Sequence, residues 1–286
     1  MIVKARMAAV LGAVVLALSG CTVGTFTQKP IPTVAQILPA PTATEIVTPA
    51  AAAWWKPTGN HSTQWQMVLS KPNPPYVAGV GIYVYDGFDA TASHVASLKS
   101  RGAKSICYMS AGSWEDWRSD AASFPASVKG KNLDGWPGEK WLDVRNLTVL
   151  KPIMEKRADV CKAKGFDAAD WDNVDGYTNG TGFPLTGAHQ LAYNKMLAEI
   201  THARGLAVSL KNDVDQIAAL EPYFDMAVNE ECFDYNECGA YSAFANKGKP
   251  VINIQYGSLK CATAKQLNIA SMKKHLSLDA SRKPCL

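Results

Sequence analysis

Acidic residues follow directly after two apolar runs of the chain. Asp172-Asn173-Val174-Asp175 comes after residues 168–171, and Glu230-Glu231 comes after residues 226–229. Two carboxyl groups can divide the work of cleaving a glycosidic bond, because one protonates the leaving oxygen while the other attacks the sugar or activates water. We therefore expect Asp172 and Glu230 to form a catalytic carboxylate pair.

Other polar and aromatic residues lie where further apolar runs end. Such residues meet at one edge when the strands are parallel, and aromatic faces there would pack against sugar rings. Trp171 is expected on this rim as well. The residues expected to contact substrate are Asp86, Tyr108, Trp114, Asn173, Asp175, Tyr177, Lys211, Asn212, Glu231 and Tyr256.

Some of these charged residues have simpler explanations. An isolated acid after a strand often caps the next helix, and Asp213 is expected to do so. Asp170 and Asp172 share one short strand, and we expect only one of them to face inward. Lys211 is either an ordinary surface lysine or a residue that binds substrate or orients an acid.

Other classes of chemistry lack their usual patterns. The chain has no Gly-x-Ser-x-Gly, no Gly-x-Gly-x-x-Gly and no Walker-type loop, which disfavours serine-hydrolase and nucleotide chemistry. Its five histidines fall in helical stretches or near the N-terminal approach, so none is an evident general base. A net charge of +4 is too small to indicate nucleic-acid binding. No cofactor or metal is expected.

A repeated unit of helix, stop and strand organises the chain after residue 53. Helical stretches end in a basic residue and glycine, and an apolar run follows. Glycine accepts the left-handed conformation that ends a helix, and a cation in the last turn suits the helix dipole. The four stops are Arg101-Gly102, Lys164-Gly165, Arg204-Gly205 and Lys247-Gly248.

This alternation predicts parallel strands with helical crossovers. Eight strands in one domain of residues 54–286 favour a single α/β (β/α)8 TIM barrel over an open doubly wound sheet. The expected strands are 65–69, 80–85, 105–108, 168–171, 206–210, 226–229, 251–254 and, most weakly, 269–272.

The N-terminal segment has the layout of an export signal. Lys4 and Arg6 precede an apolar stretch, and Leu18-Ser19-Gly20 stands directly before Cys21, as in a bacterial lipobox. We expect a signal peptide over residues 1–20, lipidation of Cys21 and a disordered Thr/Ala/Pro-rich tether over 21–53. The protein would then be exported and held on a membrane by its lipid. An ordinary secretory signal is the alternative.

Six cysteines remain after Cys21, an even number that suggests disulfides in an exported chain. Fifteen full pairings are available. Short loops favour Cys232 with Cys238 and Cys261 with Cys285, which leaves Cys107 with Cys161. Zinc is the rival explanation, but no paired Cys-x-x-Cys unit or nearby histidine supports it.

At the acidic residues the sequence resembles glycoside hydrolase family 114, the endo-α-1,4-polygalactosaminidases. The likeness runs in order from about residue 55 to near the C-terminus. The strings that carry it are Ile106–Trp117 (ICYMSAGSWEDW), Leu133–Glu139 (LDGWPGE), Asp172–Asn179 (DNVDGYTN), Leu210–Asp213 (LKND) and Val228–Cys232 (VNEEC).

The resemblance implies a (β/α)8 barrel that cuts α-1,4-linked galactosamine-containing polysaccharide internally. By position, the family's catalytic Asp falls on Asp172 and its catalytic Glu on Glu230. We assign Glu230 as general acid and Asp172 as nucleophile or base. A polymer with free amino groups is cationic, and an acidic rim would attract it. The protein is expected to act as a monomer.

One departure from the family pattern lies after residue 254. Gln255 stands where we expect the family commonly to carry an acid. This residue supports an alternative in which the chain is a non-catalytic surface barrel that binds polysaccharide. A second alternative is a glycosidase that acts on another amino-sugar exopolysaccharide. Retention or inversion at the sugar is left open by the sequence.

Overall fold

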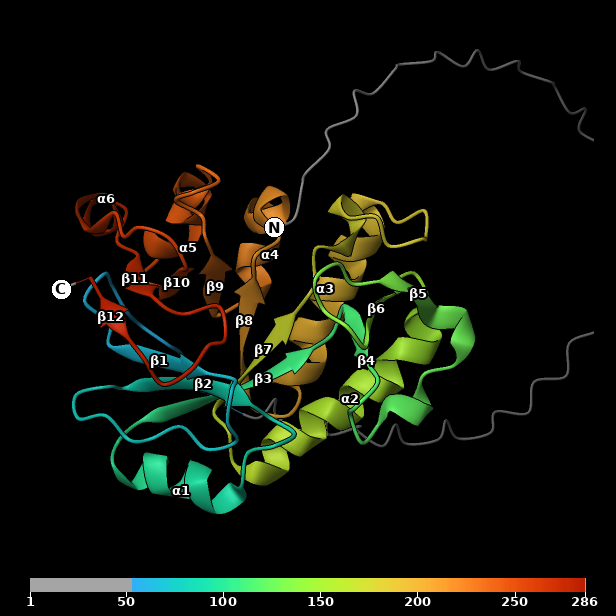
Figure 1. Ribbon diagram of the computed structural model, residues 1–286, viewed down its shortest axis with the longest axis horizontal. Helices are drawn as coiled ribbons and strands as arrows, with labels where there is room; N and C mark the ends of the chain where they lie inside the picture. Colours follow the sequence, from blue (N-terminus) through green and yellow to red (C-terminus); the bar gives the residue numbers. More distant parts are fainter. Residues whose placement is uncertain (1–52, 286) are drawn as a thin grey trace, which may run out of the picture. The chain divides into compact units, whose positions relative to one another are not determined.

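The computed structural model describes residues 53–285 (Figure 1). The predicted signal peptide, the lipidation of Cys21 and the tether up to residue 52 therefore lie outside the described residues. Within residues 53–285, no helix combines the length and the apolar character needed to cross a membrane.

The main sheet is a curled (β/α)8 barrel in which all eight predicted strands are present (Figure 1). Neighbouring strands from β1 to β11 run parallel, and a short antiparallel strand, β12, follows β11. The strands are β1 (Trp65–Val68), β2 (Ile82–Asp86), β3 (Lys104–Ser110), β7 (Ala168–Asp172), β8 (Ala207–Lys211), β9 (Met226–Glu230), β10 (Val251–Gln255), β11 (Ala270–Lys273) and β12 (Lys283–Pro284).

Long helices cover the first half of the barrel and short ones the second half. The predicted glycine stops are confirmed, because Gly102, Gly165, Gly205 and Gly248 all have positive φ. The helices are α1 (Ala92–Ser100), α2 (Leu147–Lys164), α3 (Gly187–His202), α4 (Ile217–Leu220), α5 (Ser242–Ala245) and α6 (Cys261–Gln266). The 3-10 turns are η1 (Ala121–Ser123), η2 (Ala126–Val128), η3 (Gly176–Thr178), η4 (Val214–Gln216), η5 (Glu221–Tyr223) and η6 (Cys238–Tyr241).

The seam between the first and last strands is joined largely by side chains. Trp65 Nε1 donates to the carbonyl of Ala270 at 3.0 Å. The buried Lys274 donates to Gln66 Oε1 at 2.9 Å and also to carbonyls of the C-terminal segment. These bonds hold residues 274–285 against β1, where part of the segment reaches the carboxyl end of the barrel.

Apolar side chains fill both faces of the sheet, with one cluster inside the barrel and one beneath the helices. On β7, Ala168 belongs to the inner cluster and Ala169 to the outer one. Residues two apart point the same way, so Asp170 and Asp172 share the inner face with Ala168. The expectation that only one of these acids faces inward is therefore wrong.

A small antiparallel sheet stands between β3 and α2 and was not predicted. Its strand order is β4-β6-β5, with β4 (Ser113–Glu115), β5 (Lys129–Asn132) and β6 (Glu139–Leu142). We call residues 113–142 the insert. It rises beside the carboxyl ends of β3 and β7 (Figure 1).

The three predicted disulfides are confirmed. Cys107–Cys161 ties β3 to α2 across the outer core, Cys232–Cys238 closes the loop after β9, and Cys261–Cys285 ties α6 to the C-terminus. Their sequence separations are 54, 6 and 24 residues.

Candidate active site

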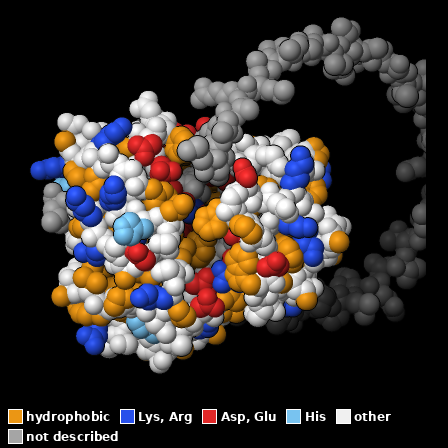
Figure 2. All heavy atoms as spheres, viewed as in Figure 1, with side chains coloured by type: hydrophobic (Ala, Val, Ile, Leu, Met, Phe, Trp, Pro, Cys, Tyr) orange, Lys and Arg blue, Asp and Glu red, His pale blue; other side chains and the backbone are white. Residues whose placement is uncertain are grey.

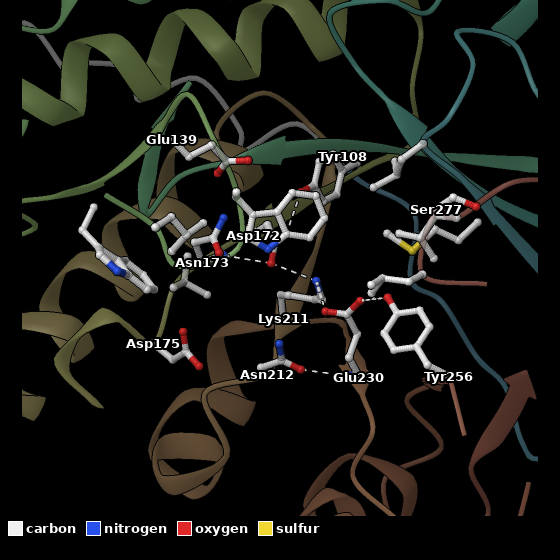
Figure 3. Close-up of a pocket in the computed structure, with 18 residues that line it drawn as sticks. Tyr108, Glu139, Asp172, Asn173, Asp175, Lys211, Asn212, Glu230, Tyr256 and Ser277 are labelled. Atoms are coloured by element: carbon white, nitrogen blue, oxygen red, sulfur yellow. Dashed lines mark hydrogen bonds and ion pairs between the residues drawn. The ribbon is translucent and has the colours of Figure 1, made fainter. Parts of the chain in front are cut away.

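A pocket of about 290 Å³ opens at the carboxyl ends of the barrel strands (Figure 3). This is the end at which barrel enzymes place their chemistry. On the molecular face in Figure 2, side chains of both charges lie among apolar ones around a central hollow. The pocket brings together the predicted residues Tyr108, Asp172, Asn173, Asp175, Lys211, Asn212, Glu230 and Tyr256.

Lys211 joins the two predicted catalytic carboxylates. Its Nζ lies 2.8 Å from Asp172 Oδ1 and 3.1 Å from Glu230 Oε2, and its side chain is only 2% exposed. The two carboxylate oxygens can therefore be no farther apart than the sum of these distances. Lys211 is therefore not an ordinary surface lysine, and its position fits a residue that orients the two acids.

Asp172 is held as an anion by several donors. Tyr108 donates its hydroxyl to Oδ2 at 2.6 Å, and the backbone N–H of Asn173 donates to Oδ1 at 2.9 Å. Burial alone would raise the pKa of Asp172, but Lys211 and these hydrogen bonds outweigh it and lower the pKa below its ordinary value. Asp172 is therefore ionised at neutral pH.

Glu230 has fewer donors and is more exposed than its partner. Tyr256 donates a short hydrogen bond to Oε1, and Lys211 approaches the other oxygen. The Glu230 side chain is 26% exposed, against 17% for Asp172. Of the two acids, Glu230 therefore has fewer donors and the better access to solvent.

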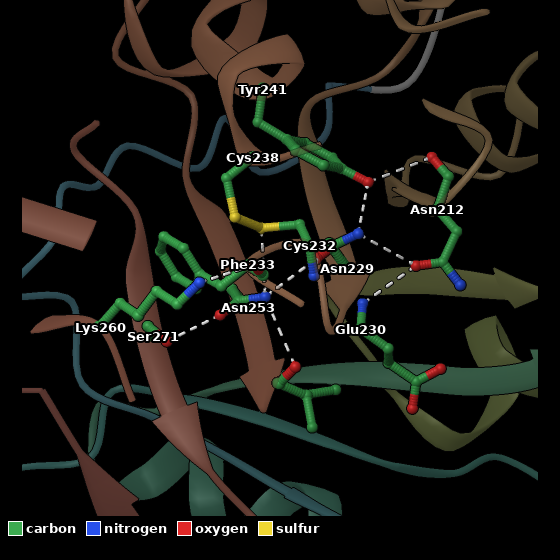
Figure 4. Close-up of a disulfide and its surroundings, with 11 residues drawn as sticks. Asn212, Asn229, Glu230, Cys232, Phe233, Cys238, Tyr241, Asn253, Lys260 and Ser271 are labelled. Carbon is green, nitrogen blue, oxygen red and sulfur yellow. Dashed lines mark hydrogen bonds between the residues drawn. A yellow bond between two sulfur atoms is a disulfide. The ribbon is translucent and has the colours of Figure 1, made fainter. Parts of the chain in front are cut away.

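The backbone behind Glu230 is fixed by a polar network and a disulfide (Figure 4). The N–H of Glu230 donates to Asn212 Oδ1 at 3.0 Å, and Asn229 Nδ2 donates to the Tyr241 hydroxyl at 2.8 Å. Asn229 Oδ1 also accepts the N–H of Cys232, next to the Cys232–Cys238 bridge. Glu230 therefore stands on a rigid support.

A left-handed residue directly follows each strand that carries one of the three central charges. Asn173, Asn212 and Glu231 have φ of 62°, 49° and 59°. Asparagine tolerates this conformation, whereas glutamate adopts it less readily. The turn stops each strand at its last inward-facing residue, so Asp172, Lys211 and Glu230 stand side by side.

Two predicted contacts, Asp86 and Trp114, lie outside the pocket lining. Asp86 is buried and pairs with Arg118 at 2.7 Å, and its Oδ1 accepts the N–H of Phe88 at 2.8 Å. Trp114 packs against the outer core and donates its indole N–H to the carbonyl of Ala121. Asp86 thus organises a turn, and Trp114 supports the insert.

Tyr177 and Glu231 also lie outside the pocket lining. Tyr177 shares a hydrogen bond with Asp213, a buried acid that it helps to enclose. Glu231 comes directly after Glu230, the last inward-facing residue of β9, and its backbone has the left-handed conformation that ends the strand. Substrate contact by either residue therefore stays a prediction that the pocket lining does not support.

Two further expectations near the strand ends are wrong. Trp171 is fully buried beneath α3, where its indole N–H donates to Thr201 Oγ1 at 2.9 Å. Asp213 makes no side-chain capping bond but accepts from Asn194 Nδ2 at 2.8 Å. Burial, with nearby Asp175, raises the pKa of Asp213 to about 8.

One wall of the pocket was not predicted from the sequence. Glu139, Trp136 and Trp141 of the insert and residues 276–278 of the C-terminal segment line the cavity. Trp136 is 52% exposed. Glu139 and Trp136 lie within the string Leu133–Glu139, which already carried the family resemblance, so a signal was present. Nothing in the sequence pointed to residues 276–278.

Among residues 53–285, no group of three or more His, Cys, Asp or Glu side chains is arranged to hold a metal ion. The lining instead combines carboxyl groups with aromatic rings. Such a pocket at the carboxyl end of a (β/α)8 barrel is typical of barrel glycoside hydrolases.

The comparisons with known proteins agree with this class. The profile of glycoside-hydrolase family GH114 matches residues 44–286, and the chain belongs to this family. It is therefore a glycoside hydrolase, as the sequence resemblance implied.

Solved structures show the same architecture. Ega3 from Aspergillus fumigatus, solved in complex with galactosamine, is 36% identical with a TM-score of 0.75, over 83% of this chain and 100% of that one. The glycoside hydrolase domain of PelA from Pseudomonas aeruginosa is 15% identical with a TM-score of 0.62, over 77% and 98%. The latter supports the fold alone. No curated protein sequence matches the chain.

Proposed function

We propose that the protein cleaves α-1,4-linked galactosamine-containing polysaccharide at internal linkages, with Asp172 and Glu230 as its catalytic pair. The observation that carries this proposal is the convergence of the two carboxylates on Lys211 at the wall of one pocket. They come from strands far apart in the sequence, and no structural need of the barrel requires them to meet there.

The surroundings of the two acids favour different roles. Asp172 carries a lowered pKa and stays ionised, which suits a nucleophile or base. Glu230 is the more exposed of the two acids, which suits the group that must reach the leaving oxygen. Lys211 limits the gap between the nearest oxygens to less than the ~6.5 Å that an inverting enzyme needs for its water. We therefore favour double displacement.

In the first step of double displacement, Asp172 attacks the anomeric carbon while Glu230 gives its proton to the departing glycosidic oxygen. Glu230 then takes a proton from water, and the water oxygen replaces Asp172 at the sugar. Retention of the anomeric configuration, read by NMR in the first minutes of reaction, is the expected result.

The substrate class rests on similarity and on charge. Ega3 was solved with galactosamine, and 36% identity over its whole length supports a related sugar here. The pocket contributes Glu139, Asp172, Asp175 and Glu230, so it favours a polymer with ammonium groups. Trp136 and Tyr256 offer aromatic faces for sugar rings.

The test uses de-N-acetylated α-1,4-galactosamine polymer and measures both reducing ends and product size. Oligosaccharides should dominate early, because an endo-acting enzyme cuts inside the chain. Monosaccharide as the first product would contradict internal cleavage, and no reducing ends after long incubation would contradict hydrolysis of this polymer. A panel of other amino-sugar polymers would show whether another substrate is cleaved faster.

The non-catalytic alternative rested on Gln255, which does not line the pocket. Gln255 is fully buried and lies on the side of β10 opposite Ile254, which packs inside the barrel. A glutamine there removes no carboxylate from the pocket. No observation now favours a binding protein without turnover.

We also propose that the protein is exported and anchored by a lipid on Cys21, and that it acts as a monomer. The sequence of residues 1–21 supports the anchor. Labelling with a fatty-acid analogue should mark the wild-type protein and leave the Cys21→Ala variant unmarked. Equal labelling of both would contradict the anchor.

A further inference from the structure

Glu139 is a pocket carboxylate that the proposed catalytic pair does not use. It begins β6 in the insert, lines the cavity and is 8% exposed. In Figure 3 it lies on the other side of Asp172 from Glu230. Glu139 therefore shares one cavity with the proposed catalytic pair.

The buried acids around Glu139 are already paired with cations. Arg118 Nη2 lies 2.7 Å from both Asp86 and Glu115, and Lys211 lies between Asp172 and Glu230. Among the described residues no Lys, Arg or His forms an ion pair with Glu139. When Glu139 is ionised, its carboxylate therefore has no cationic partner within ion-pair distance among residues 53–285.

Glu139 is nevertheless held in place. Ser113 donates its hydroxyl to Oε2 at 2.6 Å, and Ser113 Oγ lies 2.7 Å from Ser110 Oγ. Asn173 Nδ2 donates to Ser110 Oγ at 3.0 Å, which connects this chain of bonds to the residue after Asp172. The carboxyl is thus oriented by the same turn that presents the catalytic acid.

We propose that Glu139 is a specificity residue that binds the ammonium group of a glucosamine-type or galactosamine-type sugar next to the scissile bond. An ammonium supplies the missing positive charge and donates to carboxylate oxygens, whereas an N-acetyl group supplies neither charge nor a strong donor. This inference rests on the proposed function and adds a preference for the free amine over the acetylated sugar.

Binding of a cation here should release a proton. Burial raises the pKa of Glu139 to about 7, and nearby Glu115 and Asp172 raise it further while Ser113 and Arg118 lower it. Near pH 6, Glu139 is therefore largely protonated in the free protein. A bound ammonium favours the ionised form and expels the proton.

The experiment is calorimetric titration of the full chain in a Glu230→Gln background, which prevents turnover. The ligands are α-1,4-galactosamine oligosaccharides of one length, either de-N-acetylated or N-acetylated. Adding Glu139→Gln should weaken binding of the de-N-acetylated ligand about 10- to 100-fold and change binding of the acetylated one less than about 2-fold. Glu199→Gln on the exposed side of α3 is the matched control and should change neither.

Proton release at pH 6, measured in buffers of different ionisation enthalpy, should fall sharply with Glu139→Gln and persist with Glu139→Asp. A merely structural role would not move this quantity selectively. Equal weakening for both ligands, unchanged binding of the de-N-acetylated ligand, or proton release that survives Glu139→Gln would each overturn the proposal.

The outcomes separate this inference from the proposed function. If the wild-type protein cleaves no polymer but the Glu139-dependent preference for the amine is found, the inference stands and the function fails. If the polymer is cleaved but Glu139→Gln lowers kcat equally on both substrates, Glu139 belongs to the catalytic step and the inference fails.

Discussion

Both ends of the barrel carry a buried carboxylate beside basic groups. At the amino end, Asp225 accepts from Trp54 Nε1 at 3.0 Å, Lys56 Nζ at 3.2 Å and the N–H of Val208 at 3.1 Å, and His202 Nε2 lies 2.7 Å away. At the carboxyl end, Lys211 pairs with Asp172 and Glu230.

The two clusters differ in what covers them. Trp54 stacks on His202 with ring centroids 4.0 Å apart and closes the amino-end cluster, which fastens the start of the domain to the barrel. The carboxyl-end cluster borders a pocket instead. A buried ion pair is therefore no sign of function by itself, and access to the charged atoms is what separates the two ends.

Of the changes considered, Asp172→Asn at the carboxyl end should have the largest effect on activity. We expect kcat to fall at least about 10³-fold, because the ionised group that attacks the sugar or activates water is gone. The thermal midpoint should change little, since Glu230 still pairs with Lys211 and one of two neighbouring negative charges is removed. Polymer cleavage and calorimetric melting measure the two effects, and turnover near the wild-type rate would exclude Asp172 from the pair.

Lys211→Met removes the cation of the carboxyl-end cluster and leaves both acids in place, so it tests what Lys211 does for Asp172. Lys211 helps to lower the pKa of Asp172, so its loss raises that pKa. The proposed mechanism needs ionised Asp172, so the acid limb of the pH profile for kcat should move to higher pH. We expect about 10²-fold lower kcat at neutral pH. An unmoved acid limb would contradict the orienting role of Lys211.

Asp225→Asn breaks the amino-end cluster and should show the opposite pattern. We expect a loss of about 2 kcal/mol in the free energy of unfolding, because several buried donors lose their charged acceptor. The rate of polymer cleavage at 25 °C should stay within about 2-fold. Asp159→Asn, at an exposed ion pair with Arg204, is the control and should cost less than about 0.5 kcal/mol. A large change in kcat for Asp225→Asn would contradict a purely structural role for the amino-end cluster.

The smallest expected effect concerns pH and Asp213. Its folded pKa of about 8 lies above the ordinary value near 4, so this group adds stability that is fully present below about pH 4 and is lost as pH rises through 8. Asp213→Asn should reduce the fall in thermal midpoint between pH 6 and pH 9. Part of the fall should remain in the variant, because Glu139 and Asp170, each with a pKa raised to about 7, also lose their protons in this pH range. An identical fall in both proteins would contradict the raised pKa.

The barrel could be predicted because its signals are local. Each stop of a basic residue and glycine precedes an apolar run, and the strands β3, β7, β8 and β10 follow these stops closely. The acidic clusters were also local, since Asp172 and Glu230 end their own strands. The family strings confirmed the order of these elements without requiring long-range contacts.

The features that were not predicted from the sequence depend on contacts between residues far apart in the chain. β5 is a short polar strand (KGKN) with no apolar alternation, so the insert was not predicted. Asp86 seemed a rim acid until Arg118, 32 positions later, was found beside it. Trp171 was placed on the rim because it ends an apolar run, but its side chain points to the outer face of β7. Asp170 and Asp172 were expected on opposite faces, although residues two apart in a strand share one face.

A crystal structure of the Glu230→Gln protein with a de-N-acetylated α-1,4-galactosamine oligosaccharide would show whether residues 172 and 230 flank one glycosidic linkage. We expect the linkage between two sugars to lie across Lys211, with its oxygen at the residue 230 amide and the anomeric carbon about 3–3.5 Å from an Asp172 oxygen. An oligosaccharide bound elsewhere, or one whose anomeric carbons all lie beyond reach of Asp172, would contradict it.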